Sequence, residues 1–364
     1  MKKKQWIVGL VVLVALAALL YLGRDSIQQF SFGKFRTQFV QADWGKIALG
    51  IGCIYLAYFF RSIRWAWLLR HDKKVGPFTL LGTQVIGFTA VALIGRIADP
   101  VRPYLVAKKT GLPLSSQIAV YIVERLFDLG CSALLFSLAI LSIAPGSMPH
   151  PGAHKAGMLT QLLLQFPLLA GIVERFGGLI LTAFGALFLV LVRFAGEWVA
   201  LGVERFLSRF SKSFGKAAAH KILTFRSGLY TMRSFSDFAV TTLISLAMWG
   251  LIALAYIETL KAFTNVNVDQ CIVLMMASGG ASVLQLPIIG WFTQIGIVAA
   301  AISAYLKIDF EVSSACAATL LLVTFLCIIP VGLVWARFEH VSLRKVAEES
   351  EEAEEELAVE EPAG

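Results

Sequence analysis

The stretch Tyr121-Ile122-Val123-Glu124-Arg125-Leu126-Phe127-Asp128 places three ionisable residues within five positions of an apolar run at 117–143. A run of this length can cross the hydrocarbon core of a bilayer, which takes roughly 20 apolar residues. Glu124 and Asp128 are four residues apart, so a helix carries both carboxylates on one face. Each charge at the centre of a membrane helix costs roughly 2.5–3.5 kcal/mol on insertion scales. The stretch therefore predicts a membrane helix whose charged groups are paired or face water.

The composition of the whole chain predicts several such helices. Of 364 residues, 57% are hydrophobic and 15% are charged, and the mean hydropathy is +0.74, which is too apolar for an ordinary soluble domain. We expect an all-α polytopic membrane protein with about six transmembrane helices and two oppositely oriented re-entrant helical hairpins. The spans are expected at 6–22, 45–60, 117–143, 178–195, 238–258 and 314–336. We expect the first span to be a retained anchor, because no small-residue cleavage site follows it.

Two further apolar stretches contain breaks that predict hairpins. The stretch at 78–107 is broken by Gly95-Arg96-Ile97-Ala98-Asp99-Pro100-Val101-Arg102, and the stretch at 271–306 by Pro287-Ile288-Ile289-Gly290. If each enters and leaves on one side, 23 of the 32 Lys and Arg residues are cytoplasmic, eight lie outside and Arg125 lies in a span. This distribution follows the positive-inside rule and predicts that both termini are cytoplasmic. Paired breaks of this kind are typical of the midplane site of a transporter.

The sequence offers no motif for nucleotide, metal or nucleophilic chemistry. It has no P-loop, dinucleotide or nucleophile-elbow motif, its five histidines are scattered, and its five cysteines show no C-x-x-C spacing. We therefore expect no cofactor, no metal and no nucleic-acid partner, and a protein that is not an enzyme. An alternative is a membrane enzyme that acts on a lipid-linked substrate, with Glu124 or Asp128 as general base.

The chain divides into one transmembrane domain at 1–337 and an acidic tail at 338–364. Residues 348–361 contain nine glutamates and no basic residue, and without them the net charge of +8 becomes +17. Such a charge run predicts a disordered cytoplasmic tail. A tail at Glu348–Glu361 that docks a protein partner, in a structural membrane subunit, is the alternative.

Arginines of two other segments are candidate partners for the charges in 117–143. Arg96, Asp99 and Arg102 recur every three residues and share a face if that segment is helical. Arg61 and Arg64 lie at the inner end of the second span, where snorkelling to the interface is the alternative. The set contains five arginines and three carboxylates. An excess of guanidinium groups suits phosphate, which their planar fork binds bidentately.

Two roles remain open for the charged residues of 117–143. They form either an internal ion-pair network that locks the hairpin to the span, or a substrate site, and the two roles are compatible. In a site, the carboxylates would hold the guanidiniums and could also bind a cationic headgroup such as an amine.

The break in the second hairpin adds three candidates. Pro287 and Gly290 end one helix and free the N-terminus of the next, which favours anions, and Gln294 is a neutral polar ligand. A plain hairpin turn is the alternative. The predicted substrate-binding residues are Arg61, Arg64, Arg96, Asp99, Arg102, Glu124, Arg125, Asp128, Pro287, Gly290 and Gln294, with no catalytic and no metal-binding residue.

These motifs resemble the membrane region of lysylphosphatidylglycerol synthases, a family also described as flippase-like or uncharacterised inner-membrane proteins. The resemblance covers roughly 6–336 and rests on the order and spacing of the quoted motifs, namely Arg61-Ser62-Ile63-Arg64-Trp65, Gly95 to Arg102, Gly111, Glu124 to Asp128, and Pro287 to Gly290. Two positions depart from the family pattern. Ala98-Asp99 stands where the family usually has Gly-Glu, and Gln294 replaces its glutamate, so no protonatable group can be carried over to that position.

The resemblance implies a flippase-like transporter in a bacterial-type inner membrane. The substrate would be an anionic or zwitterionic phospholipid or a polyprenyl-type lipid, and its headgroup would cross through a polar intramembrane cavity. The resemblance does not imply lipid synthesis, because the synthases carry a large aminoacyltransferase domain after the membrane region and only Phe338 to Gly364 follow it here.

Overall fold

The computed structural model describes residues 30–95, 98–142, 198, 201–208, 234–281, 289–343, 345–346, 348–350 and 352. All regular structure in these residues is helical. Five segments are long and apolar enough to cross a membrane, namely Trp44–Leu69 (α4), Pro77–Ile94 (α5), Leu114–Ser142 (α7), Phe235–Lys261 (α11), and Phe310–Phe338, which comprises α14, η4 and α15. This confirms an all-α polytopic membrane protein. The spans predicted at 6–22 and 178–195 lie outside the described residues.

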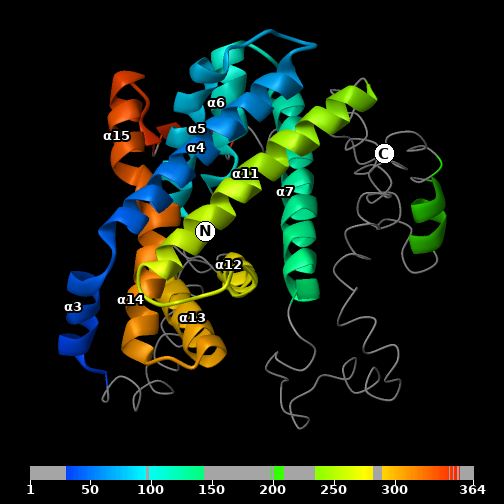
Figure 1. Ribbon diagram of the computed structural model, residues 1–364. Coiled ribbons are helices and arrows are strands. Elements are labelled where there is room, and N and C mark those ends of the chain that lie inside the picture. Colours follow the sequence, from blue (N-terminus) through cyan, green and yellow to red (C-terminus); the bar gives the residue numbers. More distant parts are fainter. Residues whose placement is uncertain are drawn as a thin grey trace.

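The bundle is built around α4 and α11, which pack along each other, while α5 lies between α4 and α15 (Figure 1). Local sequence fixes where both central helices begin. The Asp43 carboxylate accepts hydrogen bonds from the backbone N–H groups of Gly45 and Lys46, which satisfies the free donors of the first turn of α4. Ser234 and Asp237 form a capping box at the start of α11. The first residue of each central helix is therefore fixed by a capping side chain.

Two helix pairs occur at the stretches where hairpins are predicted. The first pair is α5 and Val101–Thr110 (α6), and the second is Val268–Ala281 (α12) and Ile289–Leu306 (α13); the helices of each pair contact each other. Gly95 ends α5 with φ at 94°, a backbone conformation that glycine adopts without strain. The α5 helix alone has 18 residues, so by length it could cross a membrane. The re-entrant topology stays a prediction.

One end of the bundle gathers basic residues and is tied together by side chains. We call it the basic end, defined by Arg70, Lys73, Lys74, Lys108 and Lys109. Arg70 pairs with Asp237 of α11, Lys73 donates to the Thr110 carbonyl oxygen at 2.6 Å, and Lys109 pairs with Glu339 at 2.6 Å. The end of α4, the end of α6, the start of α11 and the end of α15 therefore lie together.

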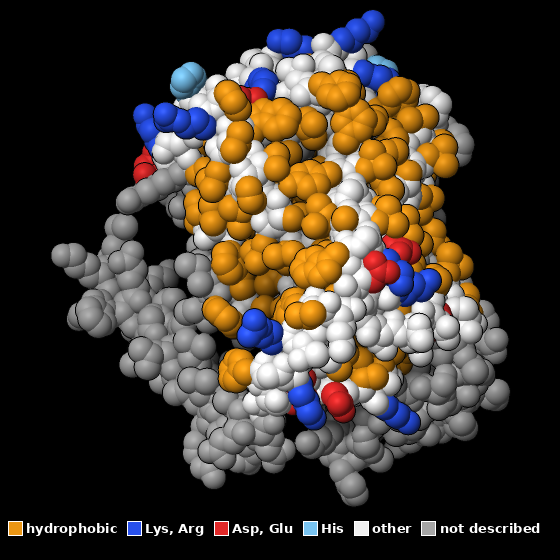
Figure 2. All heavy atoms as spheres, turned by 60° about the vertical axis from the view of Figure 1, so that its left-hand side comes forward, with side chains coloured by type: hydrophobic (Ala, Val, Ile, Leu, Met, Phe, Trp, Pro, Cys, Tyr) orange, Lys and Arg blue, Asp and Glu red, His pale blue; other side chains and the backbone are white. Residues whose placement is uncertain are grey.

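The opposite end joins different elements. Lys46 Nζ donates to the Lys261 carbonyl oxygen at 3.3 Å, and the Ser31 N–H donates to Glu311 beside Phe32–Gln41 (α3). Figure 2 shows apolar side chains over the middle of one face, with most of its charged side chains toward the two ends. This distribution is that of a protein surrounded by lipid at its middle.

The beginning of the predicted tail packs on α6 in the structure. Val346 is buried in an apolar cluster with Val101 and Leu105, and Tyr104 Oη donates to Glu349 Oε2 at 2.9 Å. This part of the tail packs because it carries apolar residues. The prediction of disorder rested on the number of glutamates and took no account of them. Residues 353–364 of the tail lie outside the described residues.

The last span contains a π-helical segment, Leu322–Leu326 (η4), between Phe310–Leu321 (α14) and Ile328–Phe338 (α15). Pro330 has no N–H to donate to the preceding turn, which loosens the helix there. Tyr55 Oη donates to the Cys327 carbonyl oxygen at 2.7 Å, and Thr89 Oγ1 to that of Ile328 at 3.3 Å. Side chains of α4 and α5 thus satisfy carbonyl groups at this break.

We expect Gly332→Ala to weaken the packing of α15 on α5. A Cβ at Gly332 would lie 1.8 Å from Thr89 Oγ1, so the helices must separate. Overpacking costs roughly 1–3 kcal/mol, and for a chain of this length the melting temperature in detergent should fall by about 1–4 °C. Gly250→Ala is the matched control, because no atom lies within 4 Å of a Cβ built there. Equal melting temperatures for the two variants would refute the close contact.

Candidate functional site

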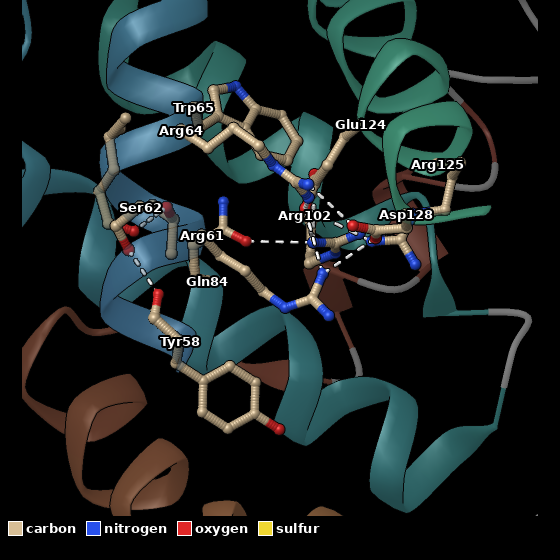
Figure 3. A network of polar contacts seen from close by, with 12 residues as sticks. Tyr58, Arg61, Ser62, Arg64, Trp65, Gln84, Arg102, Glu124, Arg125 and Asp128 are labelled. Atoms are coloured by element: carbon tan, nitrogen blue, oxygen red, sulfur yellow. Dashed lines mark hydrogen bonds and ion pairs between the residues drawn. The ribbon is translucent and has the colours of Figure 1, made fainter. Parts of the chain in front are cut away.

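Arg64 of α4 bridges the two carboxylates of α7. Its Nη2 donates to Glu124 Oε1 at 2.7 Å and its Nη1 donates to Asp128 Oδ1 at 2.8 Å (Figure 3). Nη1 also donates to Ser245 Oγ of α11 at 2.8 Å. Arg64 is entirely buried, as the two carboxylates almost are. One guanidinium therefore joins three helices. Arg64 does not snorkel to the membrane interface.

Three further arginines surround the same carboxylates. Arg61 Nη1 lies 3.2 Å from both Glu124 Oε1 and Asp128 Oδ2. Arg125 Nη2 lies 2.9 Å from Asp128 Oδ2 and 3.4 Å from Glu124 Oε1, so this residue finds its partners on its own helix. Arg102 Nη1 of α6 lies 3.5 Å from both Glu124 oxygens.

We call Arg61, Arg64, Arg102, Glu124, Arg125 and Asp128 the arginine cluster. Four guanidiniums and two carboxylates give it a formal charge of +2, since arginine stays charged in proteins and both acids are bound by guanidiniums. Ion pairing alone would require only equal numbers of guanidiniums and carboxylates. The excess of positive charge is the property that distinguishes this cluster from a purely structural network.

Arg102 reaches the cluster from α6 across a glycine of α5. A Cβ at Gly87 would lie 2.2 Å from Arg102 Cγ, so only glycine leaves room for the arginine side chain there. Arg102 Nη1 donates to Gln84 Oε1 of the same helix at 3.1 Å. The guanidinium carbon lies 4.5 Å from the centre of the Phe88 ring and 4.9 Å from that of Tyr121. Aromatic faces stabilise a cation in this geometry.

Several buried donors of the site have no hydrogen-bond partner in the part of the chain that the structure describes. They are Arg64 Nε, Arg102 Nε, Arg102 Nη2, Arg125 Nε and Gln84 Nε2. Most buried polar groups in proteins are hydrogen-bonded, because an unpaired one costs roughly 1–3 kcal/mol. The arrangement thus offers a concentration of donors to an acceptor-rich ligand.

The exposure of the arginines shows from which side the cluster is reached. The side chain of Arg125 is 36% exposed and that of Arg61 is 11% exposed, whereas Arg64 and Arg102 are buried. A ligand would meet Arg125 and then Arg61 before the buried Arg64 and Arg102.

The depth of the cluster follows from helix geometry. At about 1.5 Å per residue, Arg64 lies about 8 Å from the end of α4 at Leu69, and Glu124 about 15 Å from the start of α7 at Leu114. Both of these ends belong to the basic end. The α7 helix is about 43 Å long, so the cluster lies in the half of the bundle nearer the basic end.

The remaining predicted residues lie outside the described chain or outside the hydrogen-bonded contacts of the cluster. Arg96 and Pro287 are outside the described residues. Asp99 makes no hydrogen bond or ion pair with the cluster within the described chain, but its negative charge interacts with Arg125. Asp99 precedes α6, which begins at Val101, so the condition under which Asp99 and Arg102 would share a helical face is not met. Gly290 and Gln294 are buried on α13, which packs chiefly on α14 and α12. Of this pair, α12 packs on α7.

Three contributors to the site were missed from the sequence. Gln84 is a polar residue inside an apolar run, a signal that could have identified it. Ser245 and Trp249, whose Nε1 donates to Asp128 Oδ1 at 3.3 Å, are common in membrane helices and gave no such signal. Within the described residues no group of three His, Cys, Asp or Glu residues is placed to hold a metal ion.

We expect Asp128→Asn to destabilise the fold strongly. The substitution keeps the shape of the side chain but raises the formal charge of the buried cluster, and breaking a buried ion pair costs roughly 3–5 kcal/mol. The melting temperature in detergent should fall, and adding Arg64→Met should restore part of it by removing the unpaired charge. Asp309→Asn is the control, since that carboxylate is exposed and makes no capping hydrogen bond. Asp128→Asn melting like Asp309→Asn would contradict the buried network.

Comparison with known proteins identifies the family. The family model for the lysylphosphatidylglycerol synthase TM region matches residues 6–336 of the 364. Neither the curated proteins nor the solved structures give a significant match. The family model covers every helix that carries the arginine cluster. The chain therefore belongs to the family of the lysylphosphatidylglycerol synthase transmembrane region.

Proposed function

We propose that this protein is a flippase-like transporter that moves a phospholipid or lipid-linked headgroup between the leaflets of a membrane. The family relates the chain to lipid modification or translocation. The observation that carries the proposal is the arginine cluster, with four guanidiniums, two carboxylates and unpartnered donors inside an apolar helical bundle. Burying each ion costs several kcal/mol of desolvation free energy. A purely structural ion-pair network would therefore not be expected to contain more guanidiniums than carboxylates.

The arginines would recognise the phosphate of the headgroup. Guanidinium groups bind phosphate through paired N–H donors, and Arg102 and Arg125 carry unpartnered N–H groups. Glu124 and Asp128 hold the guanidiniums in position, with Arg64 at the centre of the network and Arg61 at its edge. The acyl chains would stay in lipid while the headgroup follows the polar groups.

Transport is favoured over catalysis by the state of the carboxylates. A general base needs a free lone pair within reach of the proton that it removes. Glu124 is contacted by four guanidiniums and Asp128 by three, and neither side chain is more than 8% exposed. Both acids are therefore committed to holding arginines, and the second candidate function, an enzyme with one of them as base, has less support.

We further propose a bacterial-type inner membrane as the location, with the basic end in the cytoplasm. Lys and Arg are enriched in cytoplasmic loops, and the basic end gathers five such residues from the end of α4, the connection to α5 and the end of α6. Both termini would then be cytoplasmic.

We expect purified protein in proteoliposomes to accelerate the exchange of fluorescent phospholipids between leaflets. Arg102→Met should slow it about tenfold or more, because one charge-assisted hydrogen bond is worth roughly 1.5–3 kcal/mol. Gly87→Ala keeps every charge but removes the room for Arg102 Cγ, so it should slow exchange as well. Arg36→Met on the exposed surface of α3 is the control for loss of one guanidinium.

One outcome of the same experiment would contradict the transport proposal. If the parent protein moved no lipid above protein-free vesicles while chemically altering lipids in the same membranes, catalysis would replace transport. Melting temperatures of all variants, measured beforehand, separate a loss of activity from a loss of fold.

We expect Lys108→Cys in intact cells to react with a membrane-impermeant maleimide only after permeabilisation. The Lys108 side chain is 65% exposed at the basic end. Lys307→Cys at the opposite end should react without permeabilisation, and it serves as the matched control because Lys307 is also exposed. Background labelling should be low, since four of the five native cysteines are buried. The reverse pattern would invert the proposed orientation.

A further inference from the structure

We propose that Gln84 and Gln117 form a further binding site for phosphate, between the arginine cluster and the basic end. We call these two residues the glutamine pair. The pair extends the site of the proposed function, on which this inference rests. Its ligand would be a phosphate, carried by a lipid headgroup or free in solution.

The orientation of each amide is fixed by a partner that can only donate. Gln117 Oε1 accepts from Trp65 Nε1 at 3.1 Å, and Gln84 Oε1 accepts from Arg102 Nη1 at 3.1 Å. Neither an indole nor a guanidinium has an acceptor atom. Turning either amide round would set its NH₂ group against another donor. Both glutamines therefore direct the NH₂ group away from the partner.

The two NH₂ groups are left without an acceptor. Within the described residues, Nε2 of Gln84 and Nε2 of Gln117 have no hydrogen-bond partner, and both residues are entirely buried. Buried polar groups are normally hydrogen-bonded, because an unpaired one is costly. An apolar side chain would fill either position without this cost. Two such donors are explained by an acceptor that binds there transiently.

Helix geometry places the glutamine pair between the cluster and the basic end. At about 1.5 Å per residue, Gln117 lies about 5 Å from the start of α7, and Gln84 about 11 Å from the start of α5. Arg102 lies about 12 Å from the end of α6. These helix ends adjoin the lysines of the basic end in the sequence. A phosphate that moves inward from this end would meet Gln117 before Gln84 and Arg102.

The pair is connected to the cluster by side chains. Gln117 precedes Glu124 by seven residues, so both lie on one face of α7. The Trp65 ring that orients Gln117 has the guanidinium carbon of Arg102 at 5.7 Å from its centre. Arg102 adds two unpartnered donors, Nε and Nη2. Free donors therefore continue from the cluster through Arg102 to the glutamine pair.

The chemistry of the free groups indicates phosphate. All of them are N–H donors, and phosphate oxygens accept several such bonds. Hydrogen bonds are strongest where a charged group takes part, and a guanidinium adds its own charge to that of the phosphate. The neutral amides would therefore hold a phosphate less firmly than the arginines do. A phosphate could leave the pair more readily than it leaves the cluster.

The glutamine pair is closed to solvent in this structure, whereas the side chain of Arg125 is 36% exposed. The pair and Arg125 would thus belong to different parts of the path. A phosphate at Nε2 uses the end of each amide that faces away from Trp65 or Arg102. It could bind without breaking either hydrogen bond, once the helices move apart enough to admit it.

The test removes the Gln117 amide from a protein in which its partner is already gone. Trp65→Phe is the reference, and Trp65→Phe with Gln117→Leu is the test variant. In proteoliposomes, the test variant should exchange acyl-labelled phosphatidylglycerol about fivefold more slowly than the reference, the equivalent of one hydrogen bond. Its melting temperature should not fall below that of the reference, because replacing both partners of a buried hydrogen bond is nearly neutral. Gln41→Leu in the same Trp65→Phe background, at an exposed position of α3, is the control.

A binding measurement in detergent does not depend on transport. Short-chain phosphatidylglycerol or inorganic phosphate would be added to the same proteins, since a ligand of the folded state raises the melting temperature. The rise should be smaller for the test variant than for the reference. A Gln117-dependent rise with inorganic phosphate would identify free phosphate as a ligand, and one with the lipid alone would identify the headgroup.

The two measurements separate the possible failures. If Gln117 serves only to pair with Trp65, the test variant and the reference will exchange lipid at equal rates and show equal rises in melting temperature. That result would overturn the glutamine pair and leave transport standing. A parent protein that moves no lipid, together with a Gln117-dependent rise in melting temperature, would contradict transport and support the phosphate site.

Discussion

The bridge from Arg64 to Glu124 and Asp128 is the interaction on which the rest of the structure depends. A buried guanidinium in an apolar bundle is stable only where carboxylates hold it, and removing one partner of such a pair costs roughly 3–5 kcal/mol. Its two donor groups fix the rotation of α4 against α7, because both carboxylates must face the same point. The additional bond to Ser245 brings α11 to that point as well. Three membrane helices thus share one polar centre.

The break between α5 and α6 is needed to bring Arg102 to the same polar centre. Arg102 lies on α6 and reaches Glu124 across Gly87, so the chain must turn back after α5 to place it there. Gly95, with its positive φ, ends α5 and allows this return. A continuous helix through the break would carry Arg102 away from α7. The helix pair therefore places a fourth guanidinium beside two carboxylates that three arginines already share, and it raises the formal charge of the cluster from +1 to +2.

Much of this could be predicted from the sequence, and what could not depends on contacts between distant segments. Hydropathy located the four predicted spans that fall within the described residues. The spacing of four between Glu124 and Asp128 placed both acids on one face, as the structure confirms. Whether Arg64 would pair or snorkel was open, because a sequence does not say which helix lies beside α4. Asp99 would share a face with Arg102 only in a helix, and the backbone at Asp99 is a turn. The buried part of the tail escaped detection because single residues such as Val346 make its contact.

The ratio of charges in the cluster also bears on how a headgroup could leave it. Four arginines alone would hold a phosphate too firmly for release, and passage through a membrane requires binding that is weak enough to end. In the proposed transporter, Glu124 and Asp128 would compete with a phosphate for the same guanidiniums, so each bond that the ligand gained would weaken an ion pair within the protein. The affinity for the ligand would then depend on the difference between two similar interactions. Because Arg61 lies on α4 and Asp128 on α7, a ligand that drew Arg61 away from Asp128 would loosen this helix contact at the same time. In the proposed transporter, binding and helix movement would then be coupled by the residues that make the site.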